Sequence, residues 1–228
     1  KITFNFGIAH GVFDKNDFYN EAPLLHEKFL YINIKKNNYQ LGIGFVHEAI
    51  WAGSTLRLGN QPSTLKDFIK VFFSEDGKKM ESDPHANALG NHLGISEFFF
   101  QNHKNNQILK LYYQHFFEDT SGLRFRNGID GLWGAELKNY IPDSTILLEY
   151  LDTTHCCVDP PYVNDIYYTH YQYDSGWSYK NYTLGNPFIN RLEHEMIKVF
   201  HLGISGTILS NYHYKVKVSR RINTNDSF

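Results

Sequence analysis

The feature that most constrains the fold is a strict alternation of apolar and polar residues with a period of two. In the first eight residues, Ile2, Phe4, Phe6 and Ile8 alternate with Lys1, Thr3, Asn5 and Gly7. The same alternation runs from Phe29 to Lys35 and, after a turn at 36–38, from Tyr39 to His47. An extended strand with this pattern has one apolar face and one polar face, so it lies between an apolar and a polar medium. The pattern therefore predicts amphipathic antiparallel strands joined as hairpins.

Further strands are predicted along the rest of the chain. We expect them at 92–102, 108–117, 129–139, 145–154, 196–204 and 207–221, with Ser205 and Gly206 as the turn between the last two. This makes roughly ten strands, enough for a large part of a barrel. The exception is 64–73, where apolar residues recur at helical spacing behind a Ser or Thr N-cap, which predicts a short amphipathic helix packed on the sheet.

The composition does not decide whether the apolar faces of the strands contact lipid or the core of a soluble protein. Aromatic residues make up 16% of the chain, which suits aromatic girdles at membrane interfaces, a surface that stacks sugars, or a soluble β-sandwich with a Tyr-rich face. No run of 18 apolar residues occurs, so no transmembrane helix is predicted. With a net charge of -2 and a pI near 6.7, we expect no nucleic-acid partner.

Signatures of catalysis and metal binding are missing from the sequence. The pairs His47-Glu48 and His194-Glu195 lack the second histidine of a zinc-protease helix, and there is no P-loop, dinucleotide fingerprint or Gly-x-Ser-x-Gly elbow. We therefore expect no catalytic residues, no metal site and no cofactor. Glu136 and Glu149 lie on neighbouring predicted strands, so a secreted all-β glycoside hydrolase stays open as an alternative. The adjacent Cys156 and Cys157 supply no disulfide framework.

The stretch from Tyr112 to Phe188 carries a series of phrases in a fixed order. These are YYQHFFEDTSGL (112–123), DGLWGAEL (130–137), LLEYLDTT (147–154), DIYYTHY (165–171), SGWSY (175–179) and GNPF (185–188). In order and density they resemble the Wzi-type capsule assembly proteins, which are β-barrels of the Gram-negative outer membrane. The resemblance covers roughly one third of the chain closely, and the flanks more loosely.

The resemblance implies an all-β, antiparallel transmembrane β-barrel in the cell outer membrane. We expect residues 1–228 to form one such domain, incomplete relative to the longer members of the family. The implied function is non-enzymatic, lectin-like attachment of capsular polysaccharide or exopolysaccharide at the cell surface. The expected partners are that polysaccharide, outer-membrane lipid and other outer-membrane proteins. An alternative is an accessory barrel subunit of a larger outer-membrane transport or assembly complex.

Candidate carbohydrate-binding residues follow from position rather than from the resemblance. Aromatic rings can stack on the C–H face of a sugar, with Asp165, His170 and Asn186 offering hydrogen bonds, and arginine can bind acidic sugars through its forked guanidinium. The alternatives are an interfacial aromatic belt and salt bridges in the barrel lumen. The candidates are Trp133, Tyr167, Tyr168, His170, Tyr171, Trp177, Tyr179, Arg124 and Arg126.

Overall fold

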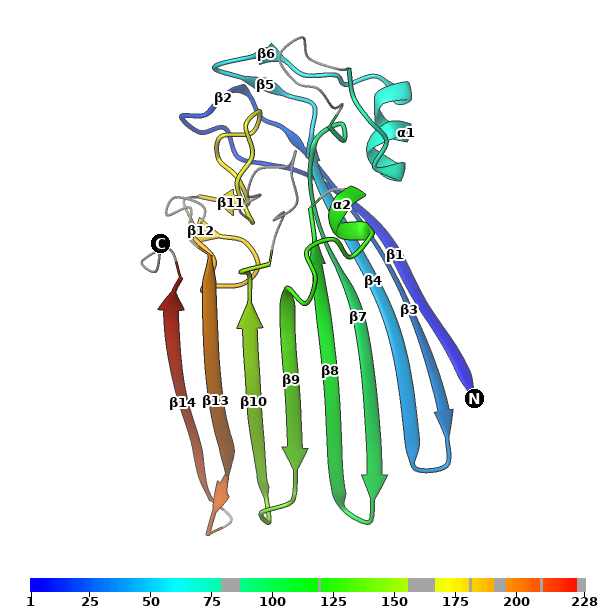
Figure 1. Ribbon diagram of the computed structural model, residues 1–228, viewed down its shortest axis with the longest axis vertical. Helices are drawn as coiled ribbons and strands as arrows, with labels where there is room; N and C mark the ends of the chain where they lie inside the picture. The colour runs from blue at the N-terminus through cyan, green and yellow to red at the C-terminus, as the bar shows by residue number, and fades with distance from the viewer. Residues whose placement is uncertain are drawn as a thin grey trace.

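The computed structural model describes residues 1–78, 87–118, 120–155, 167–180, 182–190, 196–209 and 211–224. They form one large sheet with smaller elements gathered at one end (Figure 1). The large sheet contains β1 (Ile2–Val12), β3 (Leu24–Lys36), β4 (Tyr39–Trp51), β7 (Asn91–Lys104), β8 (Gln107–Phe117), β9 (Gly131–Lys138), β10 (Ser144–Asp152), β13 (Ile197–Ile208) and β14 (Tyr212–Asn223). The smaller elements are β2 (Tyr19–Glu21), β5 (Ser54–Thr55), β6 (Gly59–Asn60), α1 (Leu65–Phe73), α2 (Thr120–Leu123), β11 (Ser178–Tyr179) and β12 (Tyr182–Thr183).

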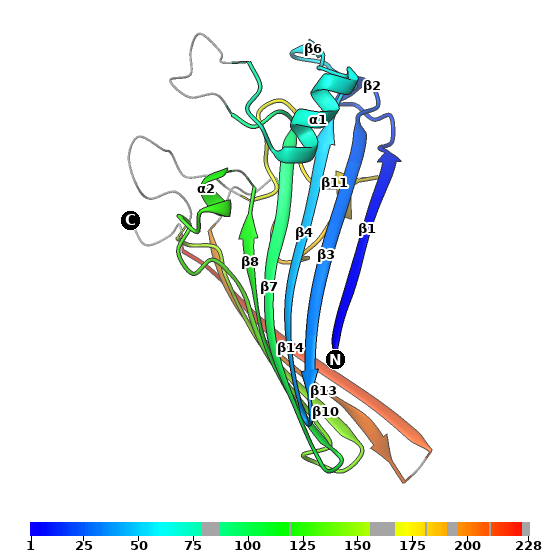
Figure 2. The same cartoon turned by 90° about the vertical axis from the view of Figure 1, so that its right-hand side faces the viewer.

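The large sheet is an antiparallel meander. Its strands follow the order β1-β3-β4-β7-β8-β9-β10-β13-β14, so each strand pairs with its neighbour along the chain in this set. The prediction of an all-β antiparallel meander is confirmed. Within the described residues β1 and β14 are the two edges of the sheet and do not pair with each other. The strands twist strongly, so that β14 crosses the direction of β1 when the sheet is seen edge-on (Figure 2).

The two ends of the strands are connected differently. At one end the strands turn back through short hairpins, with Asn37 and Asn105 in the left-handed conformation that such turns require (φ 51° and 54°). At the other end lie α1, α2, the small sheets and the long connections (Figure 1). We call these the turn end and the loop end. Among the described residues, no helix has the length and apolar character needed to cross a membrane.

The predicted turn at Ser205 and Gly206 is wrong. Strand β13 continues through both residues to Ile208, and Leu209 begins the turn with φ 52°. A side chain at Gly206 would lie 2.6 Å from the Asp143 carbonyl oxygen and 2.7 Å from the Tyr214 hydroxyl. Gly206 therefore allows neighbouring residues to pack closely against β13, and it does not mark a turn.

The register of the sheet separates two chemically different faces. One complete row across all its strands is apolar and consists of Ile2, Ile34, Leu41, Phe100, Leu111, Ala135, Leu148, Leu202 and Val218. A neighbouring row on the other face consists of Lys35, Gln40, Gln101, Lys110, Glu136, Leu147, Gly203 and Lys217. We call these the apolar face and the polar face. The twist hollows the apolar face into an open groove of about 1130 Å³.

Glycines on the polar face are covered by aromatic rings from the neighbouring strand. Gly42 lies opposite Phe99, and Gly134 lies opposite Tyr112. A Cβ atom at either glycine would lie 2.0 Å from a ring carbon of its partner. Gly7 with Phe29 and Gly44 with Tyr31 repeat the arrangement. Aromatic rings therefore fill the space that the missing side chains leave on this face.

Both faces are covered near the loop end. On the polar-face side, residues of the 167–189 segment form a core against strand residues such as Phe116, Leu151 and Val199. On the opposite side, α1 packs through Phe68 against Trp51 at 5.4 Å between ring centroids. The predicted helix and its N-cap are confirmed, because Thr64 and Asp67 form a reciprocal capping box. The middle and the turn end of the apolar face remain exposed.

Candidate functional site

A small polar pocket lies at the loop end, between the sheet and the 167–180 segment. Its volume is about 240 Å³. It brings together two of the predicted binding residues, His170 and Tyr171, with polar side chains from β7 and from the end of β8. The lining residues are Asn87, Ala88, Gly90, Asn91, His92, Glu118, Thr169, His170 and Tyr171.

Hydrogen bonds to the sheet position this segment. The Glu118 carboxylate, directly after β8, accepts the backbone N–H of Tyr168 at 2.6 Å. The Trp177 indole N–H donates to the Asn91 side chain of β7 at 3.2 Å. Arg57 donates to the backbone carbonyl of Tyr171 and lies 3.9 Å from the Asp174 carboxylate. The pocket is therefore built by contacts between parts of the chain that are distant in sequence.

The aromatic rings of the pocket have distinct roles. The His170 and Tyr171 rings stack with 4.8 Å between centroids, and Tyr171 is 38% exposed. The His170 Nδ1 atom accepts backbone N–H groups from Gln172 at 3.1 Å and Tyr173 at 3.4 Å. Burial, together with the nearby His92, lowers the pKa of His170 to about 3, so the ring is neutral at physiological pH. A neutral imidazole beside an accessible tyrosine ring can bind an uncharged hydroxylated ligand.

The other predicted binding residues are placed differently. Tyr167, Tyr168 and Trp177 are buried in the loop-end core, so their rings do not face solvent. Trp133 lies on the apolar face, where its ring stacks on Tyr113 at 3.9 Å.

The remaining candidates lie near the surface of the loop end. Tyr179 is 40% exposed and contacts Phe13 edge-on, while Arg124 and Arg126 are exposed after α2. Asp165, Cys156 and Cys157 lie outside the described residues.

A larger cavity of about 670 Å³ lies on the polar face beneath the 185–189 segment. Its walls mix apolar core residues with polar groups, which include Glu48, Gln114, Asn186, His201, Lys217 and Ser219. Glu149 also faces this cavity, and its carboxylate accepts the hydroxyl of Tyr112.

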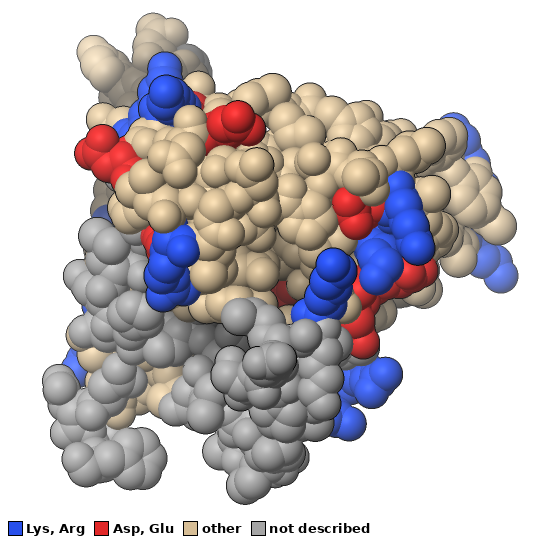
Figure 3. Space-filling view, turned by 90° about the horizontal axis from the view of Figure 1, so that it is seen from above, with Lys and Arg blue, Asp and Glu red and all other residues tan. Residues whose placement is uncertain are grey.

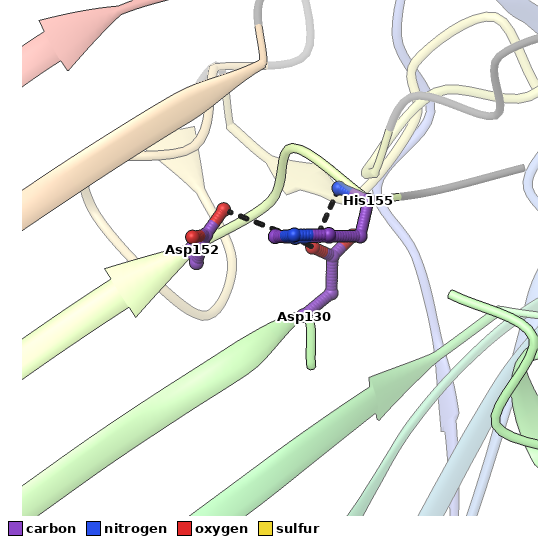
Figure 4. Close-up of side chains that lie close together, drawn as sticks. All are labelled: Asp130, Asp152 and His155. Atoms are coloured by element: carbon purple, nitrogen blue, oxygen red, sulfur yellow. Dashed lines mark hydrogen bonds and ion pairs between the residues drawn. The ribbon is translucent and has the colours of Figure 1, made fainter. Parts of the chain in front are cut away.

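A third constellation was not predicted from the sequence. Asp130, directly before β9, and Asp152, at the end of β10, lie beside His155 at the loop end (Figure 4). Donor atoms of the three residues lie within 4.8 Å of one another. Burial is the main cause that raises the pKa of the Asp130 carboxyl to about 6. We expected no metal site from the sequence, but these three side chains carry donor atoms of the kinds that bind metal ions.

Charged side chains of both signs are interspersed around the loop end. Seen from above, basic and acidic side chains lie next to each other rather than gathering by sign (Figure 3). The net charge of -2 agrees with this mixed surface. The charges of the described residues at this end therefore give little long-range field of one sign.

We compared the chain with known protein families, curated proteins and solved structures, and one family model matches it. The family model described as "Capsule assembly protein Wzi" matches residues 2–207. No curated protein and no solved structure matches the chain. The matched span runs from β1 to the last but one residue of β13, so it includes every strand of the large sheet except β14, together with the 240 Å³ pocket and the Asp130 cluster.

Proposed function

Because the chain belongs to the Wzi family of capsule assembly proteins, we propose that it forms the wall of an outer-membrane β-barrel that holds surface polysaccharide during capsule assembly. The observation that carries the membrane part is the apolar row that crosses the whole sheet. Ile2, Leu41 and Val218 in this row are more than half exposed (59%, 54% and 60%).

An apolar surface of this extent is costly in water and favourable in lipid. The opposite face supports the same proposal, because glutamine, lysine and glutamate occupy the neighbouring row. Outer-membrane barrels combine a lipid-facing apolar band with a polar interior. The proposed wall therefore has lipid on its apolar face and water on its polar face.

The proposal includes closure of the sheet. In lipid every backbone N–H and C=O group must be paired, so the outer edges of β1 and β14 need strand partners. Pairing these edges with each other or with further strands removes the unpaired groups. A closed sheet also protects the long edges from association with other chains.

The connections at the two ends suggest an orientation. Outer-membrane barrels have short turns on the periplasmic side and longer loops on the outside. We therefore assign the turn end to the periplasm and the loop end to the cell exterior. In this orientation the 240 Å³ pocket faces the surface polysaccharide.

The chemistry of the pocket supports sugar binding. Tyr171 supplies a partly exposed ring for the C–H face of a sugar, and Glu118, Asn91 and Thr169 lie around it with groups that hydrogen-bond to hydroxyls. Its volume is below the range of about 300–1,000 Å³ typical of drug-sized ligands, which suits a single sugar residue of a chain. Contacts to one residue of a repeating polymer can be multiplied along it.

The membrane part is tested by fractionation. Expressed in a Gram-negative host with an export signal, the protein should sediment with outer membranes and migrate faster on a gel before heating than after it. Recovery in the soluble periplasmic fraction, without detergent and without heat-modifiable mobility, would contradict the proposal.

The polysaccharide part is tested by binding of purified capsular polysaccharide to the detergent-solubilised protein. Tyr171→Ala removes the ring while keeping the backbone carbonyl that Arg57 contacts, so affinity should fall at least tenfold. Tyr182→Ala is the matched control, because Tyr182 is 79% exposed and does not line the pocket. Equal affinity in both variants would refute the assignment of the pocket as the polysaccharide-binding site.

A stable protein partner in detergent, with no polysaccharide binding, would favour an accessory subunit instead.

A further inference from the structure

Three side chains with metal-binding donors converge at the loop ends of β9 and β10. Asp152 pairs with Gly131 across the two strands, which brings Asp130 next to Asp152, and His155 follows three residues later (Figure 4). The His155 Nδ1 atom lies 3.2 Å from Asp130 Oδ1 and 3.7 Å from Asp152 Oδ1. Asp130 lies directly before β9, and Asp152 and His155 come from one stretch at the end of β10, so the strand pairing and the chain after β10 both contribute to the arrangement.

The two carboxylates are buried, whereas the imidazole reaches solvent. The side chains of Asp130 and Asp152 are 0% and 1% exposed, and that of His155 is 42% exposed. Lys198 lies 3.7 Å from Asp152, but among the described residues only His155 lies within ion-pair distance of Asp130. A buried carboxylate without a permanent cation is costly. The site therefore needs positive charge, and the half-exposed imidazole leaves a route by which it can enter.

Surrounding groups orient the carboxylates in the way that outer-shell residues orient metal ligands. Tyr150 donates to Asp152 Oδ2 at 2.5 Å, and Thr154 donates to Asp152 Oδ1 through both its backbone N–H and its hydroxyl. The Tyr167 hydroxyl donates to Asp130 Oδ2 at 3.1 Å. Asp130 Oδ1 also accepts the His155 backbone N–H at 2.8 Å and keeps one lone pair for an ion, whereas Asp152 Oδ1 accepts both Thr154 hydrogen bonds and would give one of them up to bind an ion.

The same network contains a further buried acceptor. Asn127 donates to the Tyr167 hydroxyl at 2.6 Å, and its own Oδ1 atom is buried with no hydrogen-bond partner in the described part of the chain. On the Asp130 side, away from Lys198, the described network therefore contains several acceptors and no permanent cation. A cation at its centre would compensate for this imbalance.

The spacing of the donors fits a small divalent ion. Zinc–ligand distances of about 2.0–2.2 Å place neighbouring ligand atoms of a tetrahedral site about 3.4 Å apart. The separations of 3.2 and 3.7 Å from His155 Nδ1 lie on either side of that value. One imidazole nitrogen with two carboxylate oxygens also suits zinc better than calcium, which takes 6–8 oxygen ligands.

We propose that Asp130, Asp152 and His155 bind a divalent transition-metal ion of the zinc type. The ion would cross-link the ends of β9 and β10 to the segment that begins at His155, and so stabilise the loop end of the sheet. The proposal does not depend on polysaccharide binding, because it concerns other residues and has its own assay.

The experiment measures zinc binding to the detergent-solubilised protein after removal of metals with a chelator. All proteins carry Cys156→Ser and Cys157→Ser, so that thiolates next to His155 in the sequence do not supply ligands. Isothermal titration calorimetry should give about one zinc ion per chain, and zinc should raise the unfolding temperature. Calcium should bind at least tenfold more weakly than zinc.

Two variants test the assignment against a simple ion pair. Asp130→Asn and His155→Gln should each weaken zinc binding at least tenfold, while His213→Ala, at an exposed position of β14 near the turn end, should bind like the parent protein. His155 is half-exposed, so its replacement keeps the test valid if Asp130→Asn does not fold. No stoichiometric zinc in the parent, or unchanged affinity in His155→Gln, would show that the cluster is only a His–Asp ion pair.

Discussion

Two adjacent leucines offer a direct test of which face of the sheet contacts lipid. Leu148 lies at the middle of β10 in the apolar row, between Ala135 and Leu202, and it is 46% exposed. Leu147 lies in the polar row, opposite Glu136 and Gly203. The same substitution to lysine therefore places one charge on the apolar face and one on the polar face, at almost the same depth.

The expected cost differs between the two positions. Lysine on the lipid face near the bilayer midplane costs about 2–4 kcal/mol. Fully burying a leucine contributes about 2 kcal/mol, so the 46% of Leu148 that faces outward adds about 1 kcal/mol of lost lipid contact. We expect Leu148→Lys to lower the free energy of unfolding by about 3–5 kcal/mol. Leu147→Lys should change it by less than about 1 kcal/mol, because Glu136 lies opposite it.

The assay is reversible urea unfolding of both variants from phospholipid vesicles, followed by tryptophan fluorescence. Gel mobility without heating reports the fraction folded in the same samples. The reasoning fails if the two variants lose the same stability, or if Leu148→Lys folds in water without detergent as well as the parent protein. Either result would mean that the exposed apolar row contacts something other than lipid.

Two further substitutions test local features of the fold. Gly134→Ala forces the Tyr112 ring away from its position and breaks the Tyr112–Glu149 hydrogen bond, so stability should fall by about 1–3 kcal/mol in urea unfolding; a loss below about 0.5 kcal/mol would show that the ring moves freely. His170 accepts two backbone N–H groups only while it is neutral, and its pKa is lowered from 6.5 to about 3. The unfolded chain binds a proton on His170 below pH 6.5 and the folded chain does not, so the parent should lose stability as the pH falls from 6.5 towards 3. His170→Gln should flatten this part of the pH profile, and identical profiles would contradict the argument.

Local pattern was enough to predict the strands with strict alternation. The hairpin from Phe29 to His47 is present as β3 and β4, since alternation, an Asn-containing turn and an apolar face all agree there. The helix at 64–73 was predictable for the same reason, because its capping residues and its helical period point to one structure. The turn at Ser205 and Gly206 was wrong because glycine in a strand can also mark close packing.

The candidate site depended much less on local pattern. The 165–179 segment contains enough aromatic residues to suggest a binding loop, but not which rings face inward. Trp177 is fully buried beneath the segment, whereas Tyr171 is partly exposed beside the pocket. Periodicity cannot separate the two, because residues 167–177 are irregular and their burial depends on Asn91 in β7 and on Glu118 directly after β8.

By itself, the sequence determined that the chain is an amphipathic antiparallel meander, because a two-residue period can be satisfied only by strands between two media. The ordered phrases from Tyr112 to Phe188 likewise indicated the Wzi family, which the match over residues 2–207 confirms. Only the tertiary structure decided that Asp130, Asp152 and His155 meet at one point, and that Trp133 lines the groove of the apolar face and not the 240 Å³ pocket. The physical reason is that strand register, rather than spacing along the chain, sets which side chains become neighbours across a sheet.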